Sequence, residues 1–480
     1  METEFCLETY LQKTLQPLVE EPLSKMEQFD RACKVIQQEF EREWNDTDDL
    51  AKNRKLEREK RAIMGYDDET RFYKEKIREM LGELKLQDCW YPPWYPNLTE
   101  GIFAELYGLA GVAPWAYDME PRFVQSSSAK IIGNRIYCLL DGKVQLMPQQ
   151  ISDRRREQLK RTLLLASPTE RLEYGFHEVY LRNGIRITIY SGSRTKQGQD
   201  IIVFRKYVLG DLSFEALVRK GTIPAEAVAL FKQMIAIGFN VLFAGQVRSG
   251  KTTFLQIWQK QEDSLLEGVA VATDPETPWH KIMPEAPIMQ LIADGKQLED
   301  MTKSLLRGDN DYLLMEEMRD GIAFRLALDM TSTGTARSKA TIHDRDGVNI
   351  PYKMASKIRE RYGGDDQDLI AQVFQNFDYV IELVQSAEDK SRKIMRGILE
   401  YHYDMEEDKV FCRQICQYDF DRNQWLWNRK GAMCKLNKYP EAELSITHMG
   451  QILESLWEQH PLGDVCIYPA YYRGNRHGCE

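Results

Sequence analysis

The stretch GQVRSGKTT, residues 245–253, decides the fold of the central part of this chain. It has the form G-x-x-x-x-G-K-T and lies between an apolar run, residues 239–244, and a helical pattern that begins near Phe254. A loop of this form between a buried strand and a helix binds phosphate, because successive backbone N–H groups and the positive end of the helix dipole point at the phosphate oxygens. The pattern therefore predicts a nucleotide-binding α/β domain.

The fixed residues of this loop have separate predicted roles. A tight turn at the first glycine ends the strand, and the second glycine lets the backbone close around the phosphate. The lysine reaches the β- and γ-phosphates, and the hydroxyl of Thr252 joins the coordination shell of a Mg²⁺ ion. We therefore expect ATP and Mg²⁺ to bind here. The predicted nucleotide-binding residues of the loop are Gly245, Gln246, Val247, Arg248, Ser249, Gly250, Lys251, Thr252 and Thr253.

Three later stretches supply candidate catalytic groups. "DYLLMEEMRD" is an apolar strand that ends in Glu316 and Glu317, and carboxylates at the carboxyl end of a neighbouring parallel strand face the same crevice as the loop. One of them would hold Mg²⁺ through water while the other orients the attacking water. "ATDPET" places Asp274 and Glu276 after another strand, and "KATIH" ends at His343, where an imidazole senses the γ-phosphate or donates to it. Each candidate has a structural alternative. Glu316 and Glu317 would form a solvated acidic turn, Asp274 and Glu276 would cap a turn, and His343 would have a structural role only.

The order of these motifs resembles the secretion ATPase superfamily, nearest to its VirB11 and tight-adherence pilus (CpaF-type) branches. The resemblance covers roughly residues 100 to 425 and rests on "DLSFEALVRKGTIPAEAVALFKQMIAIGFNVLFAGQVRSGKTT" and "LLRGDNDYLLMEEMRDGIAFRLALDMTSTGTARSKATIH". It places Glu317 at the Walker B glutamate. The residues that match the family's T-G-H-x-x-S-x-x-T-x-H box are Thr333, Gly334, Ser338, Thr341 and His343.

The resemblance implies a small α+β N-domain followed by a RecA-like P-loop ATPase domain. In the family, arginines of the N-domain face nucleotide held between the two domains, which assigns that role to Arg186 in "LRNGIRITIY" and Arg205 in "IIVFRKY". Asp274 or Glu276 would be the general base. The family also implies a hexameric ring that couples ATP hydrolysis to protein secretion, pilus assembly or conjugative transfer through a membrane-embedded partner.

The chain departs from the family pattern at several positions. Glu316 replaces the glycine before the Walker B glutamate, Asn310 replaces a proline, Thr335 replaces the first histidine of the box, and Arg337 replaces a glycine. The acidic box is reduced to "ATDPETPW". These changes motivate a first alternative, an ATP-binding scaffold or regulator with little turnover. A second alternative is a nucleic-acid translocase, but the net charge of −10 disfavours it, and we expect no direct binding of nucleic acid.

The 480 residues are too many for one core and predict several domains. The expected order is a charged helical extension, an α+β N-domain, a linker, the P-loop domain, and a C-terminal helix with a tail, at residues 1–98, 99–207, 208–224, 225–430 and 431–480. Strands of the P-loop domain are expected at 239–244, 268–273, 312–315, 339–343 and 378–384. The charge-rich stretch 51–80 is interpreted either as a solvated helix or helical hairpin, or as a docking arm for a partner or for nucleic acid.

Composition and cysteine usage favour a cytoplasmic protein. The nine cysteines are scattered, without a zinc-type pair, and are interpreted as reduced thiols. No apolar run is long enough to span a bilayer, and METEFCLETYLQ lacks the features of a secretory signal. We therefore expect a cytoplasmic protein that reaches the inner face of the membrane through its partner.

Overall fold

The computed structural model describes residues 24–45, 49–167, 175–208, 210–273, 277–293 and 295–478. The chain divides into two compact units. The first extends through residue 208 apart from residues 141–143, and the second contains those three residues and everything from residue 209 onward. Each unit is described by itself below.

The first unit begins with helices and continues into an antiparallel sheet. Its helical elements are α2 (Lys25–Asn45), α3 (Asp49–Ile63), α4 (Asp67–Glu83), α5 (Leu98–Leu106), η1 (Ala110–Val112), α6 (Ala113–Ala116), α7 (Pro121–Val124), α8 (Asp153–Ala166) and η2 (Gly192–Arg194). Its strands are β1 (Ser128–Ile132), β2 (Arg135–Leu140), β3 (Lys143–Gln150), β4 (Phe176–Tyr180), β5 (Arg186–Tyr190) and β6 (Ile201–Arg205). They form one sheet in the order β3-β2-β1-β6-β5-β4.

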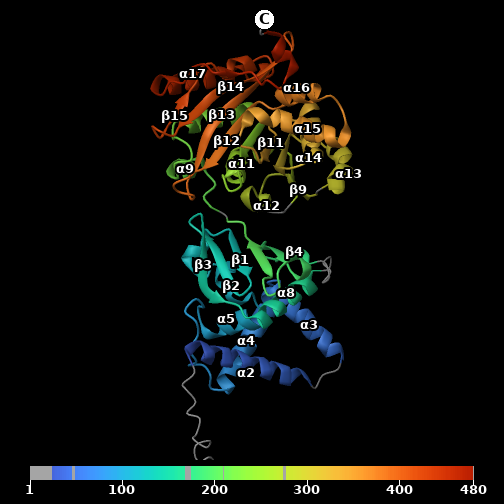
Figure 1. Ribbon diagram of the computed structural model, residues 1–480, viewed down its shortest axis with the longest axis vertical. Helices are drawn as coiled ribbons and strands as arrows, with labels where there is room; N and C mark the ends of the chain where they lie inside the picture. Colours follow the sequence, from blue (N-terminus) through green and yellow to red (C-terminus); the bar gives the residue numbers. More distant parts are fainter. Residues whose placement is uncertain are drawn as a thin grey trace, which may run out of the picture. The chain divides into compact units, whose positions relative to one another are not determined.

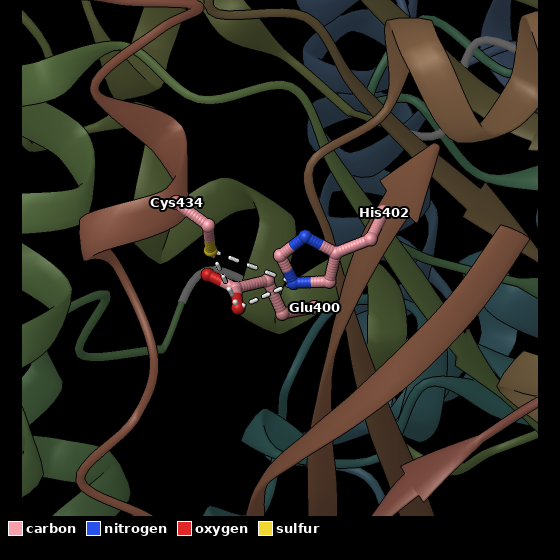
Figure 2. A group of neighbouring side chains, drawn as sticks. All are labelled: Glu400, His402 and Cys434. Carbon is pink, nitrogen blue, oxygen red and sulfur yellow. Dashed lines mark hydrogen bonds and ion pairs between the residues drawn. The ribbon is translucent and has the colours of Figure 1, made fainter. Parts of the chain in front are cut away.

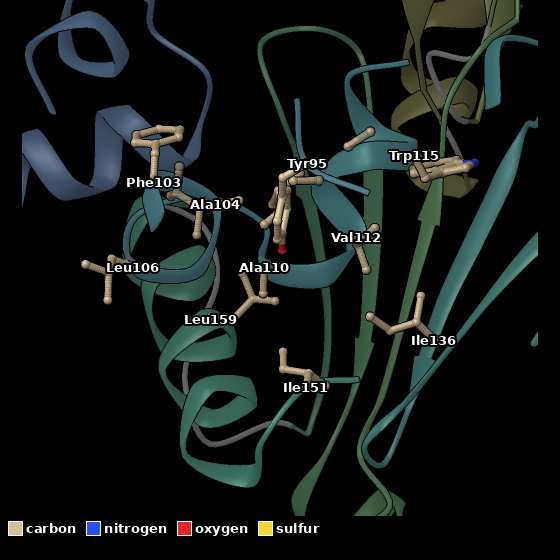
Figure 3. Close-up of a cluster of buried hydrophobic side chains, with 14 of the residues drawn as sticks. Tyr95, Phe103, Ala104, Leu106, Ala110, Val112, Trp115, Ile136, Ile151 and Leu159 are labelled. Carbon is tan, nitrogen blue, oxygen red and sulfur yellow. The ribbon is translucent and has the colours of Figure 1, made fainter. Parts of the chain in front are cut away.

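One hydrophobic core joins these helices to the sheet. Tyr73, Ile77 and Met80 of α4 are buried at helical spacing, so one face of this charged helix packs inward while the opposite face carries the charges. Figure 3 shows the part of the core where α5, η1, α6, β2 and α8 meet, with Trp115 and Leu159 among the labelled side chains. The predicted boundary at residue 98 therefore falls inside a compact unit, whereas the one at 207 adjoins the division between the units.

The second unit contains a mostly parallel sheet with an antiparallel extension. Its strands are β7 (Val241–Gly245), β8 (Gly268–Ala272), β9 (Ile288–Ile292), β10 (Tyr312–Met318), β11 (Lys339–Ile342), β12 (Tyr379–Gln385), β13 (Lys393–Asp404), β14 (Lys409–Asp419), β15 (Gln424–Trp427) and β16 (Cys466–Ile467). The order is β15-β14-β13-β12-β7-β11-β10-β8-β9, and β16 pairs with β14. Pairing from β9 to β12 is parallel, and pairing from β12 to β15 is antiparallel.

Helices cover both faces of this sheet (Figure 1). They are α9 (Phe214–Arg219), α10 (Ala227–Ile237), α11 (Lys251–Gln259), α12 (Trp279–Ile282), α13 (Gly295–Leu305), α14 (Gly321–Ser332), α15 (Ile350–Tyr362), α16 (Asp366–Asn376) and α17 (Glu443–Gln459), with short turns η3 (Gly347–Asn349), η4 (Met433–Lys435), η5 (Pro440–Ala442) and η6 (Arg473–Gly478). Side chains of β7 alternate between the layers: Leu242 joins the core formed with α13 to α16, and the ring of Phe243 packs on Phe254 and Trp258 of α11.

The predicted fold class is confirmed. All five strands expected in the P-loop domain are present to within two residues at most ends, and the helix expected within residues 431–480 forms as α17. Within the parallel part of the sheet, β9 was not expected: it is a short edge strand in which Met289 and Ile292 are exposed, so it lacks the apolar run of a buried strand.

Candidate functional site: a phosphate-binding loop and its partners

The predicted phosphate-binding loop connects β7 to α11. Its two glycines are required by geometry. A Cβ atom on Gly245 would lie 2.2 Å from the carbonyl oxygen of Leu383, and Gly250 has φ +93°, a left-handed conformation that suits glycine at the start of α11. Lys251 is the first residue of the helix, followed by Thr252 in the same turn. The loop therefore has the strand–glycine–helix geometry that phosphate binding needs.

The side chain of Lys251 lies along the loop and reaches the neighbouring strand. Its Nζ donates to the carbonyl oxygen of Gln246 at 2.8 Å and lies 3.2 Å from Nδ1 of His343. Burial lowers the pKa of Lys251 to about 8, although the charge of Glu317 opposes the shift. The oxygens of a phosphate placed beside this ammonium group would offset the cost of burying its charge.

Glu317 occupies a distorted position at the end of β10. Its backbone has φ +65°, and the register of β10 against β11 shifts between Met315 and Met318. The N–H of Glu317 donates to the hydroxyl of Thr341 at 2.8 Å. Positive φ at a residue other than glycine is strained and recurs at active sites, so the local bulge aims this carboxylate in a direction that a regular strand would not allow.

His343 connects the lysine to this glutamate. Its Nε2 lies 2.7 Å from Oε1 of Glu317, whose other oxygen, Oε2, accepts from Arg319 at 2.5 Å. Burial and the charge of Lys251 lower the pKa of His343, so the ring is neutral at pH 7. Burial would raise the pKa of Glu317, but Arg319 and His343 outweigh it, and the carboxyl is ionised. Nδ1 then accepts from the lysine and Nε2 donates to the carboxylate.

The strand order explains why these three groups meet. β11 lies between β7 and β10 and is parallel to both, so their carboxyl ends are adjacent. Two hydroxyl side chains brace β10, one from Ser338 directly before β11 and one from Thr341 on β11. The hydroxyl of Ser338 accepts from the N–H of Leu313, and that of Thr341 from the N–H of Glu317. Two residues that the resemblance singled out therefore hold the strand that carries Glu317.

Glu316 does not join this cluster. Its side chain is buried, with Oε2 accepting from the Thr277 hydroxyl and Oε1 from the indole N–H of Trp279, both at 2.7 Å. The hydroxyl of Thr277 in turn accepts from Gln256 of α11 at 2.9 Å. Asp274 and Glu276 lie outside the described residues, and Glu316 holds the residues that directly follow them. No sequence signal pointed to Trp279, because its bond depends on the pairing of β8 with β10.

The remaining loop residues differ in exposure. Val247 is exposed, Arg248 has φ +65°, and Ser249 is fully buried. With its amide oriented so that the oxygen faces Arg345, Gln246 accepts two bonds from that guanidinium group. The sequence did not single out Arg345, which lies two residues after His343.

Arg337 stands where the family has a glycine, and its backbone shows why glycine is usual there. Its φ is +57°, in the left-handed region. The guanidinium compensates by donating to the carbonyl oxygens of Ile235 and Ala236 at the end of α10 and by pairing with Glu262 at 2.7 Å. Arginine at this position therefore strains the backbone but caps the end of α10.

The two predicted arginines of the first unit are direct neighbours. Arg186 of β5 and Arg205 of β6 are opposite each other in the antiparallel register, so their side chains share one face of the sheet. Arg186 also pairs with Glu178 of β4 at 2.7 Å. The register therefore brings the two arginines together on the sheet, with one of them paired to a carboxylate.

Two of the curated proteins that match this chain are VirB11 proteins from different organisms. The chain is 27% identical over 146 residues to the type IV secretion system protein VirB11 of Bartonella quintana, which covers 29% of this chain and 40% of that protein. The corresponding protein of Bartonella henselae is 26% identical over 167 residues, covering 32% and 45%. The resemblance to the secretion ATPase superfamily is confirmed. No family model matches this secretion ATPase-like chain.

Other relatives are more distant. The uncharacterised protein MJ0900 of Methanocaldococcus jannaschii is 23% identical over 261 residues, covering 51% of this chain and 43% of that protein. The secretion ATPase-like chain therefore spans less than half the length of the curated relatives it matches. Among solved structures, the ADP-bound pilus retraction motor PilT has a TM-score of 0.43 at 14% identity, covering 73% of this chain and 94% of that one. The ATPase DotB of Legionella pneumophila has 0.41 at 12%, covering 72% and 87%.

Proposed function

We propose that this chain is an ATPase that drives transport through a membrane-embedded secretion or pilus assembly. The observation that carries the proposal is the convergence of Lys251, His343 and Glu317 at the adjacent ends of β7, β11 and β10. A cation for phosphate, a neutral imidazole and an ionised carboxylate are the groups that phosphoryl transfer to water requires. The similarity to VirB11 supports the transport role.

Each group has a distinct task in the proposed reaction. Lys251 and the loop N–H groups bind the β- and γ-phosphates of ATP. Glu317, held by Arg319 and the strand bulge, orients the attacking water, and His343 transmits the presence of the γ-phosphate from Lys251 to that carboxylate. Asp274 or Glu276 is proposed as the general base. Glu316 is proposed to position that acidic segment through Thr277 and Trp279 rather than to contact substrate.

The donor set at the loop also fits Mg²⁺. A threonine hydroxyl in the first turn of α11 and a carboxylate at the end of a nearby strand are hard oxygen ligands, which this ion prefers. Thr252 would bind it directly, and Glu317 would hold it partly through water. When bound, the ion supplies charge neutralisation to the β- and γ-phosphates.

The oligomeric state and the partner also belong to the proposal. We propose a ring of six identical chains, by analogy with the family that the sequence resembles, in which Arg186 and Arg205 contact the nucleotide. Within the described residues, no helix combines the length and the apolar character needed to cross a bilayer. A membrane-embedded platform protein is therefore proposed as the anchor. Light scattering with and without a non-hydrolysable ATP analogue tests the ring, since a mass that stays at one chain in both would contradict it.

A comparison of four proteins tests the hydrolysis: wild type, Lys251→Ala, Glu317→Gln, and Glu285→Gln as a matched control at an exposed glutamate. We expect Glu317→Gln to lower kcat by about 100-fold or more with ATP still bound, because it removes the group that orients water. Lys251→Ala should weaken ATP binding, and the control should change neither. The motor proposal fails if wild type binds ATP but hydrolyses it no faster than Glu317→Gln, an outcome that would support the scaffold alternative.

A further inference from the structure

A second cluster of chemically active side chains lies in the antiparallel part of the second unit. Glu400 and His402 are two residues apart on β13, and Cys434 is in the turn η4, so their side chains come from distant parts of the sequence (Figure 2). Their ligand atoms face one another. His402 Nε2 lies 2.7 Å from Glu400 Oε2, and Cys434 Sγ lies 3.5 Å from that oxygen and 3.6 Å from that nitrogen.

These separations are close to the edges of a tetrahedral zinc site. With zinc–sulfur and zinc–nitrogen or zinc–oxygen bonds of ordinary length, sulfur lies about 3.6 Å from each lighter ligand, and nitrogen lies about 3.4 Å from oxygen. Both sulfur edges already have these values. Only the histidine–glutamate edge is shorter, because these two groups are hydrogen-bonded to each other, and a rotation of the imidazole ring would open it.

The surrounding residues fix the orientation of the two ligands on β13. The other oxygen of Glu400, Oε1, accepts from the Tyr379 hydroxyl at 2.6 Å and from the N–H of Ala432 at 3.0 Å, which leaves Oε2 directed at the cluster. The ring of His402 stacks on Phe411, with centroids 4.5 Å apart and planes 11° from parallel. Outer contacts of this kind orient the ligands in protein metal sites.

The ligand set selects the kind of metal. One thiol, one imidazole and one carboxylate combine soft and hard donors, a mixture that suits Zn²⁺ and does not suit Mg²⁺ or Ca²⁺. Cys434 is exposed, so an ion can enter and a water molecule can complete the fourth position. In the part of the chain that the structure describes, the ligand atoms of these three side chains lie close enough together to share one metal ion.

Two cationic side chains, Lys435 in η4 and Arg413 on β14, oppose a cation here. Lys435 is paired with Asp378 at 3.3 Å, and Nη1 of Arg413 lies 3.6 Å from Glu400 Oε2 and 3.7 Å from Cys434 Sγ. The Nε of Arg413 lies 3.4 Å from Asp464, which balances much of its charge. Arg413 is therefore compatible with an ion whose three ligands include two anionic groups.

We propose that Glu400, His402 and Cys434 bind one Zn²⁺ ion. The ion fastens the turn η4 to strand β13 and so ties the segment between β15 and α17 to the sheet. Its role is structural and independent of the proposed ATPase reaction, so either proposal can fail without the other.

The test measures zinc in the untagged full-length chain. Wild type purified without chelator is expected to contain about one zinc per chain. After chelator treatment it should take zinc up again, and Co²⁺ in its place should give a sulfur-to-cobalt charge-transfer band. Cys434→Ser, a nearly isosteric change at an exposed residue, should abolish this band and lower the zinc affinity at least about tenfold. Cys89→Ser, in the first unit, is the matched control and should bind zinc like wild type.

A variant of Arg413 separates this proposal from a metal-free ionic cluster. If zinc binds, Arg413→Met removes a like charge beside the ion and should strengthen zinc binding. If the cluster is held by Arg413 alone, the same variant should lose stability with no response to zinc. The proposal is overturned if stripped wild type takes up no zinc, or if Cys434→Ser binds zinc as tightly as wild type.

Discussion

Raising the pH from 7 to 9 is expected to weaken nucleotide binding about tenfold, because binding holds a proton on Lys251 that the empty site releases. Burial lowers the pKa of this lysine to about 8 in the ligand-free chain. A phosphate group beside the ammonium raises that pKa again. The bound pKa is then higher than the free pKa, so binding takes up protons and the affinity falls as the pH rises through 8.

The size of the effect follows from the fraction of lysine that is neutral. At pH 8 about half of the lysine in the ligand-free chain is neutral, so nucleotide binding takes up about half a proton, and at pH 9 it takes up about nine tenths of a proton. The neutral His343 ring does not titrate in this range, since its pKa is lowered. ADP in the presence of a chelator is a suitable ligand, because its phosphates are ionised above pH 8 and no metal ion takes part.

Isothermal titration calorimetry in two buffers of different ionisation enthalpy measures this uptake directly. Lys251→Arg is the matched control, since a guanidinium group stays protonated at every pH used. It should show no uptake and a flat pH dependence wherever it still binds. Equal proton uptake by wild type and Lys251→Arg would refute the reasoning, and so would a wild-type affinity that does not change between pH 7 and pH 9.

Three substitutions test the packing around the site, each by urea unfolding. Gly245→Ala should destabilise the second unit by about 3 kcal/mol, because its Cβ would lie 2.2 Å from a backbone carbonyl; a loss below about 1 kcal/mol would mean that the loop is looser than described. Arg337→Gly should relieve left-handed strain yet still destabilise by about 2 kcal/mol, because buried Glu262 loses a partner; a gain in stability would contradict this account. Trp279→Phe should cost about 1 to 2 kcal/mol by removing the donor to Glu316, and an unchanged midpoint would show that this bond contributes nothing.

The sequence predicts the P-loop domain well for a physical reason. A glycine-rich loop between a buried strand and a helix has few alternative conformations, so GQVRSGKTT specifies β7, the turn and the start of α11 together. The apolar runs that precede Glu317 and His343 likewise specify strands β10 and β11. Their identity as neighbours of the P-loop strand came from the resemblance, because periodicity alone does not give strand order.

Other features depend on long-range contacts that no local pattern contains. Most residues of helix α4 are polar, and only a few apolar side chains form its buried face, so its packing into the core of the first unit was not predicted. Glu316 and Glu317 are adjacent in sequence, yet a bulge directs one into a buried network and the other to His343. The meeting of Cys434 with Glu400 and His402 requires the turn after β15 to fold back over β13, which spacing along the chain does not reveal.

The position of β11 also limits how the molecule can move. This strand is hydrogen-bonded to β7 on one side and to β10 on the other along its described length, so it cannot slide without breaking both ladders. Its backbone amides should accordingly be among the slowest in the chain to exchange with deuterated water. Because this strand is fixed, the backbone at His343 is held in place, and in the proposed reaction a change in nucleotide state would be transmitted by rotation of the imidazole ring alone.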